Sequence, residues 1–502
     1  MSIVSFSFII FLLISVIVYY LFPKKHRWTV LLLSSVIFFV STCPYYLLLY
    51  LIFDILVAFF GTKLISKTED EKKKKIILTI SIALIIGILI LLKWINIVPM
   101  TINLFGDLFK IHTNMGMLNL VAPLGVSYYT LSIIGYVVDV YRGAYERENN
   151  IFKLSLFAGY YPILVSGPFV RYNYMKKELF EEKVFSYTNI FQGFERIIYG
   201  LMKKLVIADL LAPYVKVIFN EYYVYSGYFI IIGLVFYAIQ IYADFSGCMD
   251  IVIGASKMYG ITLEENFNSP FLSKNLSEFW RRWHISLGGW GKDYIMYPLL
   301  KSNLFQKIGT TLKSKFGKKT GKLMTTLLSI LILWLFIGIW HGASYRYIFC
   351  AGILPWFYLA CGQVFEDSIK WFNEKMHIRT ECFSFNLFRR LRTLGFMCFI
   401  WLFACSSSLK ESLHVIRQIL VIPDTSLFQS LPHLPVFILF ITLGLVLVVD
   451  ILNYKGINFL EKFDEQNVIF KYIVIFLIIY IILMYGAYGP GYNATDFIYG
   501  GF

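Results

Sequence analysis

Residues 278–293 read Glu278-Phe-Trp-Arg-Arg-Trp-His-Ile-Ser-Leu-Gly-Gly-Trp-Gly-Lys-Asp293. This stretch concentrates charged residues, one histidine and three tryptophans within an otherwise apolar chain. If residues 279–287 are helical, Trp280, Trp283 and His284 share one face, and Arg281 and Arg282 point to other surroundings. Because ionisable groups inside a membrane are expensive and usually functional, a function should be sought here first.

A second histidine, His341, lies in Gly338-Ile-Trp-His-Gly-Ala-Ser-Tyr345, at the end of the apolar run 323–340. A neutral imidazole at membrane depth can take a proton from a hydroxyl while that oxygen attacks an activated acyl group. Burial lowers the affinity of an imidazole for protons and so keeps it neutral. A core histidine hydrogen-bonded to a carbonyl is the alternative, and for either histidine alone both interpretations stay open.

Composition indicates an integral membrane protein. Hydrophobic residues make up 58% of the chain and charged residues 15%, whereas soluble proteins have roughly half and a quarter. Several apolar segments approach the length of about 20 residues that a helix needs to cross a bilayer. We expect an all-α fold with about ten to twelve transmembrane helices, together with re-entrant or interfacial helices. Residues 3–22 lack the flanks of a cleaved signal peptide and are interpreted as a retained membrane helix.

The formal net charge of +15 does not indicate a nucleic-acid partner. The basic residues gather in short segments between apolar runs, which is the positive-inside pattern of membrane proteins. These segments are 24–27, 72–75, 203–204, 301–322 and 389–392.

The sequence does not support a metal site, a disulfide framework, or a hydrolase, nucleotide-binding or zinc-protease motif. The seven cysteines are scattered, with no CxxC motif or Cys/His ligand spacing, so no metal site and no disulfide framework are expected. The sequence contains no GxSxG elbow, Walker loop, GxGxxG fingerprint or HExxH pair. We expect no bound cofactor.

The order of segments predicts one membrane domain over residues 1–502. Two crossings should lie between the basic loops at 24–27 and 66–75, separated at Pro44, and residues 119–140 should form another. Residues 157–169 are interrupted by prolines, which fits either a cavity-lining broken helix or a kinked one. Residues 242–247 are expected to join the apolar segments 230–244 and 251–259.

Glu278–His284 with Trp290 and Asp293, and the block 338–345 around His341, resemble the two signature blocks of the membrane-bound O-acyltransferase family. Supportive matches extend over most of the chain and resemble the branch that contains the membrane subunit of alginate O-acetylation. They are Pro123–Thr130 with Asp139–Arg142, Val165–Pro168 with Arg171-Tyr172, and Asp244–Gly247 with Asp250. A related branch transfers D-alanine to teichoic acids.

The resemblance implies a helical bundle around a tunnel, with signature blocks at 278–294 and 338–345. His341 matches the family's catalytic base, and His284 matches its second active-site position. The expected reaction moves a small acyl group, with acetyl favoured, from a cytoplasmic thioester such as acetyl-CoA or an acyl carrier protein. The acceptor would be a hydroxyl of an exported cell-surface polysaccharide.

Further residues are candidates for the substrate path. Trp283, Trp290, Trp340 and Asp293 would line the tunnel, with ordinary packing as the alternative role of the tryptophans. Arg281, Arg282 and Lys292 would attract a phosphate of the donor or anchor the protein at the cytoplasmic face. Gly338 would leave space beside His341 or permit close helix packing.

The expected setting is the bacterial cytoplasmic membrane, with an extracytoplasmic acyltransferase as partner. D-alanyl transfer from a carrier protein to teichoic acid is the alternative within the enzyme class. A lipid or polysaccharide transporter is the alternative from another class, and it leaves both histidine blocks unexplained.

Overall fold

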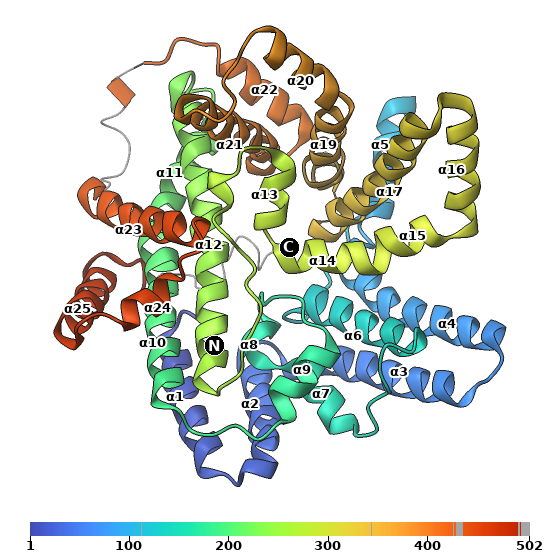
Figure 1. Cartoon of the computed structure of the whole chain (residues 1–502), viewed down its shortest axis with the longest axis vertical. Helices are drawn as coiled ribbons and strands as arrows, with labels where there is room; N and C mark the ends of the chain where they lie inside the picture. Colours follow the sequence, from blue (N-terminus) through green and yellow to red (C-terminus); the bar gives the residue numbers. More distant parts are fainter. Residues whose placement is uncertain (112, 343, 425, 428–434, 490–491, 493–502) are drawn as a thin grey trace. The chain divides into compact units, whose positions relative to one another are not determined.

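The fold is given by a computed structural model that describes residues 1–111, 113–342, 344–424, 426–427, 435–489 and 492 (Figure 1). Over these residues the regular structure is helical, and the only β-type pairing is an antiparallel bridge between Phe267 and Trp283. The expectation of an all-α protein is therefore confirmed.

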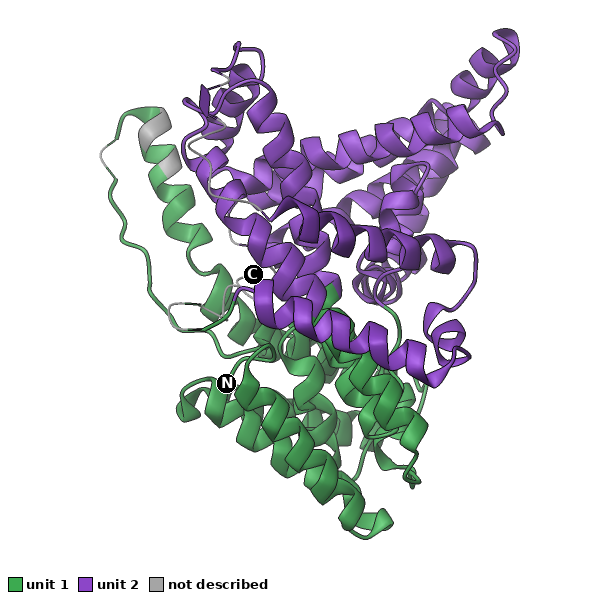
Figure 2. Cartoon of the chain, turned by 90° about the vertical axis from the view of Figure 1, so that its left-hand side faces the viewer, with its two compact units in different colours: residues 1–201, 247–265, 488–502 green, residues 202–246, 266–487 purple. Residues whose placement is uncertain are grey.

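Contacts group the chain into two compact units, each built from discontinuous segments (Figure 2). Unit 1 comprises residues 1–201, 247–265 and 488–502, and unit 2 comprises residues 202–246 and 266–487. Helix α12 (Tyr228–Met258) contributes residues to both units. The single domain expected over the whole chain stays a prediction.

In unit 1, a proline separates two of the N-terminal helices. α2 (Arg27–Thr42) ends before Pro44 and α3 (Leu48–Lys67) begins after it, which confirms the expected break at the proline. Residues 45–67 are long and apolar enough to cross a membrane, whereas α2 has only 16 residues, so the second crossing stays a prediction. α3 packs against α4 (Glu71–Leu89) and α6 (Val126–Tyr141). The other helices of this unit are α1 (Phe6–Leu21), α5 (Ile97–Phe109), α7 (Ile151–Gly159), α8 (Tyr161–Leu164), α9 (Tyr172–Phe180) and α10 (Tyr187–Leu201).

The expected helix over residues 119–140 begins only at Val126. Gly125 precedes it with φ 71°, and a Cβ on this glycine would lie 1.9 Å from the carbonyl oxygen of Leu164. The chain therefore enters α6 through a tight turn that only glycine can occupy. The interrupted segment near Pro162 forms α7 and α8, two short helices with buried residues.

Unit 2 carries the histidine blocks. Its elements in chain order are the π-helix η4 (Met202–Ala208), α11 (Asp209–Asn220), the first part of α12, the 3-10 helix η5 (Pro270–Leu272), α13 (Leu276–Arg282), α14 (Ile285–Gly291), the π-helix η6 (Lys292–Met296), α15 (Tyr297–Lys301), α16 (Asn303–Phe316), α17 (Lys318–His341), α18 (Tyr345–Ile348), the π-helix η7 (Phe349–Ile353), α19 (Leu354–Val364), α20 (Glu366–Lys375), α21 (Phe383–Cys405), α22 (Leu409–Gln418), α23 (Val436–Tyr454), α24 (Phe459–Asp464) and α25 (Val468–Tyr485).

Among the described residues, seven helices are long and apolar enough to cross a membrane. They span residues 45–67, 71–94, 228–258, 318–341, 345–364, 436–454 and 468–485. The expected ten to twelve crossings exceed this number, because some apolar stretches, such as the 16-residue α6, form helices shorter than about 20 residues. The chain is a multi-pass integral membrane protein.

Three segments expected to be polar connections are helical instead. Lys203 and Lys204 are buried in η4, because carboxylates and a hydroxyl surround their ammonium groups. Residues 242–247 continue α12 without a break. The basic tract 301–322 forms α16 and the start of α17, whose lysines face outward from amphipathic turns.

Candidate active site

The prediction of one continuous helix over residues 279–287 is wrong at its centre. α13 ends at Arg282, Trp283 is extended, and His284 has φ 49° in the left-handed region before α14 begins. Trp280, Trp283 and His284 therefore do not share one helical face. A non-glycine residue in this conformation costs about 1–3 kcal/mol, so the surrounding structure must hold it.

Residues 266–268 provide that support. The Asn268 N–H donates to the Arg282 carbonyl at 2.9 Å, and the Ile285 N–H donates to the Asn266 carbonyl at 3.0 Å. Between these two bonds lies the antiparallel bridge of Phe267 with Trp283. These bonds to a distant segment replace the intrahelical bonds that would have continued α13.

The structure brings His284, Trp340 and His341 together. His284 is buried, with its ring centroid 4.8 Å from Phe245 and 6.1 Å from Trp340. The Trp340 ring lies 4.9 Å from the ring of His341, the last residue of α17. His341 is partly exposed, so the pair combines a buried imidazole with an accessible one.

Burial, with a smaller contribution from the nearby His341 imidazole, lowers the pKa of His284 well below its ordinary value. His284 is therefore neutral near pH 7. Both effects disfavour the imidazolium, so this residue is suited to act through a neutral nitrogen.

The pKa of His284 predicts how stability changes with pH. As the pH falls below about 6.5, an unfolded chain protonates this residue and the folded chain does not, so folding loses stability. Compared with His284→Gln, the wild-type protein should lose roughly 1 kcal/mol of its free energy of unfolding as the pH falls from 6.5 to 5.5. Apparent unfolding temperatures in detergent from pH 7.5 to 5.5 measure this difference. Parallel curves for the two proteins would contradict it, and the exposed His414→Gln control should follow the wild type.

Asn266, the first residue of the second segment of unit 2, contacts His284 directly. Its side chain is fully buried, and its Nδ2 and Oδ1 lie 3.2 and 3.3 Å from His284 Nδ1. Oδ1 also accepts hydrogen bonds from the backbone N–H and the hydroxyl of Ser286, at 3.0 and 2.9 Å. One amide thus fixes both the imidazole and the first turn of α14.

The other tryptophan candidates pack among aromatic side chains. Trp283 is buried and stacks on Phe279 with ring centroids 5.5 Å apart. Trp290 stacks on Phe336 of α17 at 5.6 Å, and Asp293 follows it in η6, partly buried. Their expected roles in a tunnel stay predictions.

Gly338 faces the backbone of the neighbouring helices. A Cβ at this position would lie 3.0 Å from the Ile348 Cα and the Tyr347 carbonyl oxygen, and 3.1 Å from the Gly352 Cα. These atoms belong to α18 and η7, so the contacts support the helix-packing role among the two that the sequence left open.

Replacing Gly338 by alanine should destabilise the protein by about 1–3 kcal/mol, because backbone atoms must move to admit the methyl group. Gly362→Ala in α19 is the matched control, since its Cβ would meet nothing within 4 Å. There alanine should be neutral or stabilising by up to about 1 kcal/mol. Thermal unfolding in detergent compares the two variants, and a Gly338→Ala protein as stable as the control would contradict the packing role.

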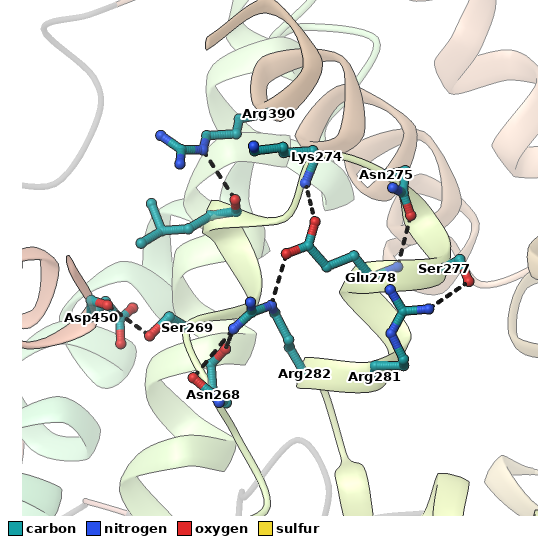
Figure 3. Close-up of polar contacts among 11 residues, drawn as sticks. Asn268, Ser269, Lys274, Asn275, Ser277, Glu278, Arg281, Arg282, Arg390 and Asp450 are labelled. Atoms are coloured by element: carbon teal, nitrogen blue, oxygen red, sulfur yellow. Dashed lines mark hydrogen bonds and ion pairs between the residues drawn. The ribbon is translucent and has the colours of Figure 1, made fainter. Parts of the chain in front are cut away.

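Arg281 and Arg282 belong to a basic cluster, which we define as Lys274, Arg281, Arg282, Arg390 and Arg392. Figure 3 shows Arg282 reaching Glu278 and Asn268, whereas Arg281 turns to Ser277. The guanidinium groups of Arg282 and Arg390 lie 4.6 and 5.3 Å from the centroid of the Tyr454 ring.

Among the described residues, Arg282 is the one member of the basic cluster with a carboxylate within 4 Å, that of Glu278 at 3.1 Å. Arg390 and Arg392 instead donate to the backbone carbonyls of Leu272 and Lys274. Burial and the neighbouring Arg389 lower the pKa of Arg392, as expected where positive charges lack nearby negative ones. The cluster therefore has an excess of positive charge.

A buried ion pair holds the part of α12 that touches His284. Lys204 Nζ lies 2.6 Å from Asp244 Oδ1 and 2.9 Å from Asp209 Oδ1. The side chains of Lys204 and Asp244 are 3% and 2% exposed, so this pair is sequestered from solvent. Phe245, next to Asp244 in the chain, is the residue whose ring meets the His284 imidazole.

Sequence reasoning did not assign Asn266, Phe245 or the Lys204–Asp244 pair to the site. The signals were present: residues 266–275 are polar in an apolar chain, and Asp244 is a carboxylate inside an apolar run. Their pairing depends on contacts over distances of 18 and 40 residues, which periodicity does not reveal.

Comparison with known proteins identifies the family of the chain. The sequence model of the MBOAT, membrane-bound O-acyltransferase family, matches residues 147–408, which include both histidine blocks. The chain is 33% identical over 247 residues to the probable alginate O-acetylase AlgI of Pseudomonas aeruginosa, covering 48% of this chain and 44% of that protein.

Two further relatives carry other names. The peptidoglycan O-acetyltransferase of Helicobacter pylori is 29% identical over 350 residues, covering 64% of this chain and 61% of that protein. The teichoic acid D-alanyltransferase of Bacillus subtilis is 27% identical over 267 residues, covering 50% of this chain and 61% of that protein. The matched region thus spans about half the length of these relatives. Because the family model matches more than half of the chain, the protein belongs to the membrane-bound O-acyltransferase family.

Proposed function

We propose that this protein is an O-acyltransferase that transfers a small acyl group, with acetyl favoured, from a cytoplasmic thioester to a hydroxyl of an exported cell-surface polysaccharide. The observation that carries the proposal is the meeting of His284 and His341 around Trp340 in a membrane protein. Acyl transfer to a hydroxyl requires a base and a group that stabilises charge on the acyl oxygen.

In this proposal His341 is the general base, because it is the partly exposed member of the pair and can meet an incoming acceptor. Its imidazole takes the hydroxyl proton as the acceptor oxygen forms a bond to the thioester carbon. The tetrahedral intermediate then collapses, the carbon–sulfur bond breaks, and the proton passes from His341 to the leaving thiolate.

His284 orients or polarises the acyl group, for which its neutral, buried imidazole is suited. Trp340 fixes the spacing of the two imidazoles by contacting both rings. Trp283, Trp290 and Asp293 belong to the proposed substrate path only as neighbours of this centre, whereas Gly338 packs against α18 and η7.

The basic cluster is proposed to receive a phosphate of the acyl donor, with Lys292 as a further exposed cation on η6. Arg282 lies two residues before His284, so their Cα atoms are at most about 7 Å apart. In this proposal the flexible arm between the phosphate and the thioester of the donor would connect the cluster to the histidines. Arginine is well suited to this task because its guanidinium recognises phosphate in a bidentate manner.

Reversing the charge of exposed Arg281 tests the phosphate contact. Arg281→Glu should raise the KM for acetyl-CoA about tenfold, since one charge-assisted phosphate contact contributes roughly 1.5–3 kcal/mol. The KM for acetyl-pantetheine, which lacks phosphate, should change less than twofold, and kcat should be retained for both donors. Equal effects on the two donors would contradict the assignment.

D-alanyl transfer is the second candidate, favoured by the similarity to the Bacillus subtilis relative. Membranes that contain the protein together with its native extracytoplasmic partner, supplied with either acetyl-CoA or a D-alanyl carrier protein and a polysaccharide or teichoic-acid acceptor, separate the two. Acyl transfer from acetyl-CoA supports the first proposal, transfer only from the D-alanyl carrier supports the second, and intact donors in every combination would contradict both. The proposed setting is the bacterial cytoplasmic membrane, with an extracytoplasmic partner that completes transfer.

A further inference from the structure

The side chain of Asn266 is held in one orientation by Ser286. A backbone N–H can only donate, so the atom of the amide that faces Ser286 N at 3.0 Å must be the oxygen. The Ser286 hydroxyl donates to the same oxygen at 2.9 Å. Both acceptor positions of Oδ1 are thereby used, and an inverted amide would set an NH2 group against the Ser286 N–H.

This orientation determines which atom of Asn266 serves His284. Nδ2 lies 3.2 Å from His284 Nδ1, and an amide nitrogen can only donate. Oδ1 lies 3.3 Å from the same Nδ1, but it already accepts both hydrogen bonds from Ser286. The shorter contact, from an atom that can only donate, therefore assigns Nδ1 the acceptor role, without a proton of its own. In a neutral imidazole the proton therefore resides on Nε2.

We propose that Asn266 is a positioning residue that fixes His284 as the Nε2–H tautomer, so that His284 acts as a hydrogen-bond donor and not as a second base. The inference rests on the proposed function, because it assigns the two histidines of one acyl-transfer site to different tasks. The Nε2–H donates to the acyl oxygen as negative charge develops on it, while the acceptor's proton goes to His341.

The surroundings of His284 favour this division of tasks. Burial of the ring and the nearby His341 both disfavour an imidazolium, which would carry a proton on each nitrogen. In the neutral ring Nε2 can donate only if the proton resides there, so donation depends on the tautomer. The ring is confined by Phe245 at 4.8 Å and Trp340 at 6.1 Å. The left-handed backbone of His284 is held by the Ile285 bond to the Asn266 carbonyl, so one residue sets both backbone and tautomer.

Asn266→Asp is the discriminating variant. A carboxylate keeps the acceptor for Ser286 and offers only acceptors to His284, so the neutral imidazole should move its proton to Nδ1. Nε2 then loses its donor, and kcat at pH 8 should fall about 100- to 1,000-fold, as on removal of one oxyanion donor, with KM changed less than threefold.

The pH dependence separates a donor from a base. The new carboxylate should raise the pKa of His284, and the imidazolium regains an Nε2–H. The ratio of kcat for Asn266→Asp to kcat for the wild type should therefore rise at least tenfold as the pH falls from 8 to 6. Changes with pH that are common to both proteins cancel in this ratio. A base role for His284 predicts a ratio that falls on acidification.

Nitrogen-15 NMR of histidine-labelled protein in lipid vesicles reads the tautomer without any activity. The His284 signal, identified by its loss in His284→Gln, should show a protonated Nε2 in the wild type and in the Ser286→Ala control, and a protonated Nδ1 in Asn266→Asp at pH 8. A wild-type His284 protonated on Nδ1 would overturn the inference even if the variant fails to fold. Absence of acyl transfer by the wild type would instead contradict the proposed function.

Discussion

Replacing His341 by alanine is expected to reduce acyl transfer by at least about 100-fold, because the acceptor hydroxyl loses its general base. The ring lies at the end of α17 beside Trp340 and is partly exposed, so its removal leaves the helix and most packing intact. The loss should appear in kcat, with little change in the KM for the donor. Initial rates of thioester consumption by purified protein in vesicles, with acceptor present, provide the measurement.

The control for this loss is His414→Ala, which removes an exposed imidazole from α22. Its rate should equal that of the wild type within a factor of two. Near-normal transfer by His341→Ala at matched abundance would show that the base lies elsewhere.

Replacing Lys204 by methionine is expected to destabilise the protein by about 3–5 kcal/mol, because it removes the ammonium group that lies 2.6 Å from the buried carboxylate of Asp244. Asp244 and Phe245 are adjacent on α12, so the contact of Phe245 with His284 should be disturbed as well. We expect a lower apparent unfolding temperature, lower abundance in the membrane and loss of transfer. Thermal unfolding of detergent-solubilised protein measures the first of these.

Two variants calibrate this result. Asp209→Asn should destabilise the protein less than Lys204→Met does, because Asp209 is 13% exposed and Lys204 keeps its ion pair with Asp244. The double variant Lys204→Met, Asp244→Asn should recover part of the loss, since the buried charge is gone. A single Lys204→Met protein as stable as the wild type would show that the pair has no structural role.

The sequence was sufficient for features that depend on local composition. The apolar runs gave the all-α membrane architecture, and Pro44 gave the separation of α2 from α3. The two histidines could be singled out because ionisable groups are rare in such a chain. Their meeting around Trp340 could not be derived from periodicity, because it brings together segments 56 residues apart.

The predictions that the structure contradicts failed because of interactions between segments distant in the sequence. A helical pattern over 279–287 is interrupted at His284 because residues 266–268 take its backbone hydrogen bonds. Two adjacent lysines suggested a cytoplasmic loop, yet Lys204 is buried because Asp244 neutralises it. In both cases a partner outside the local window overrode the local pattern.

Mass spectrometry of the ester-linked groups that mild base releases from cell-surface polymers measures whether His341 catalyses acyl transfer. Cells that express the wild-type protein would be compared with cells that express His341→Ala at equal membrane abundance. We expect polymer-bound acetate in the first and its loss in the second. Loss of D-alanine instead would favour the teichoic-acid alternative, and identical esters in both would contradict the claim that His341 catalyses acyl transfer.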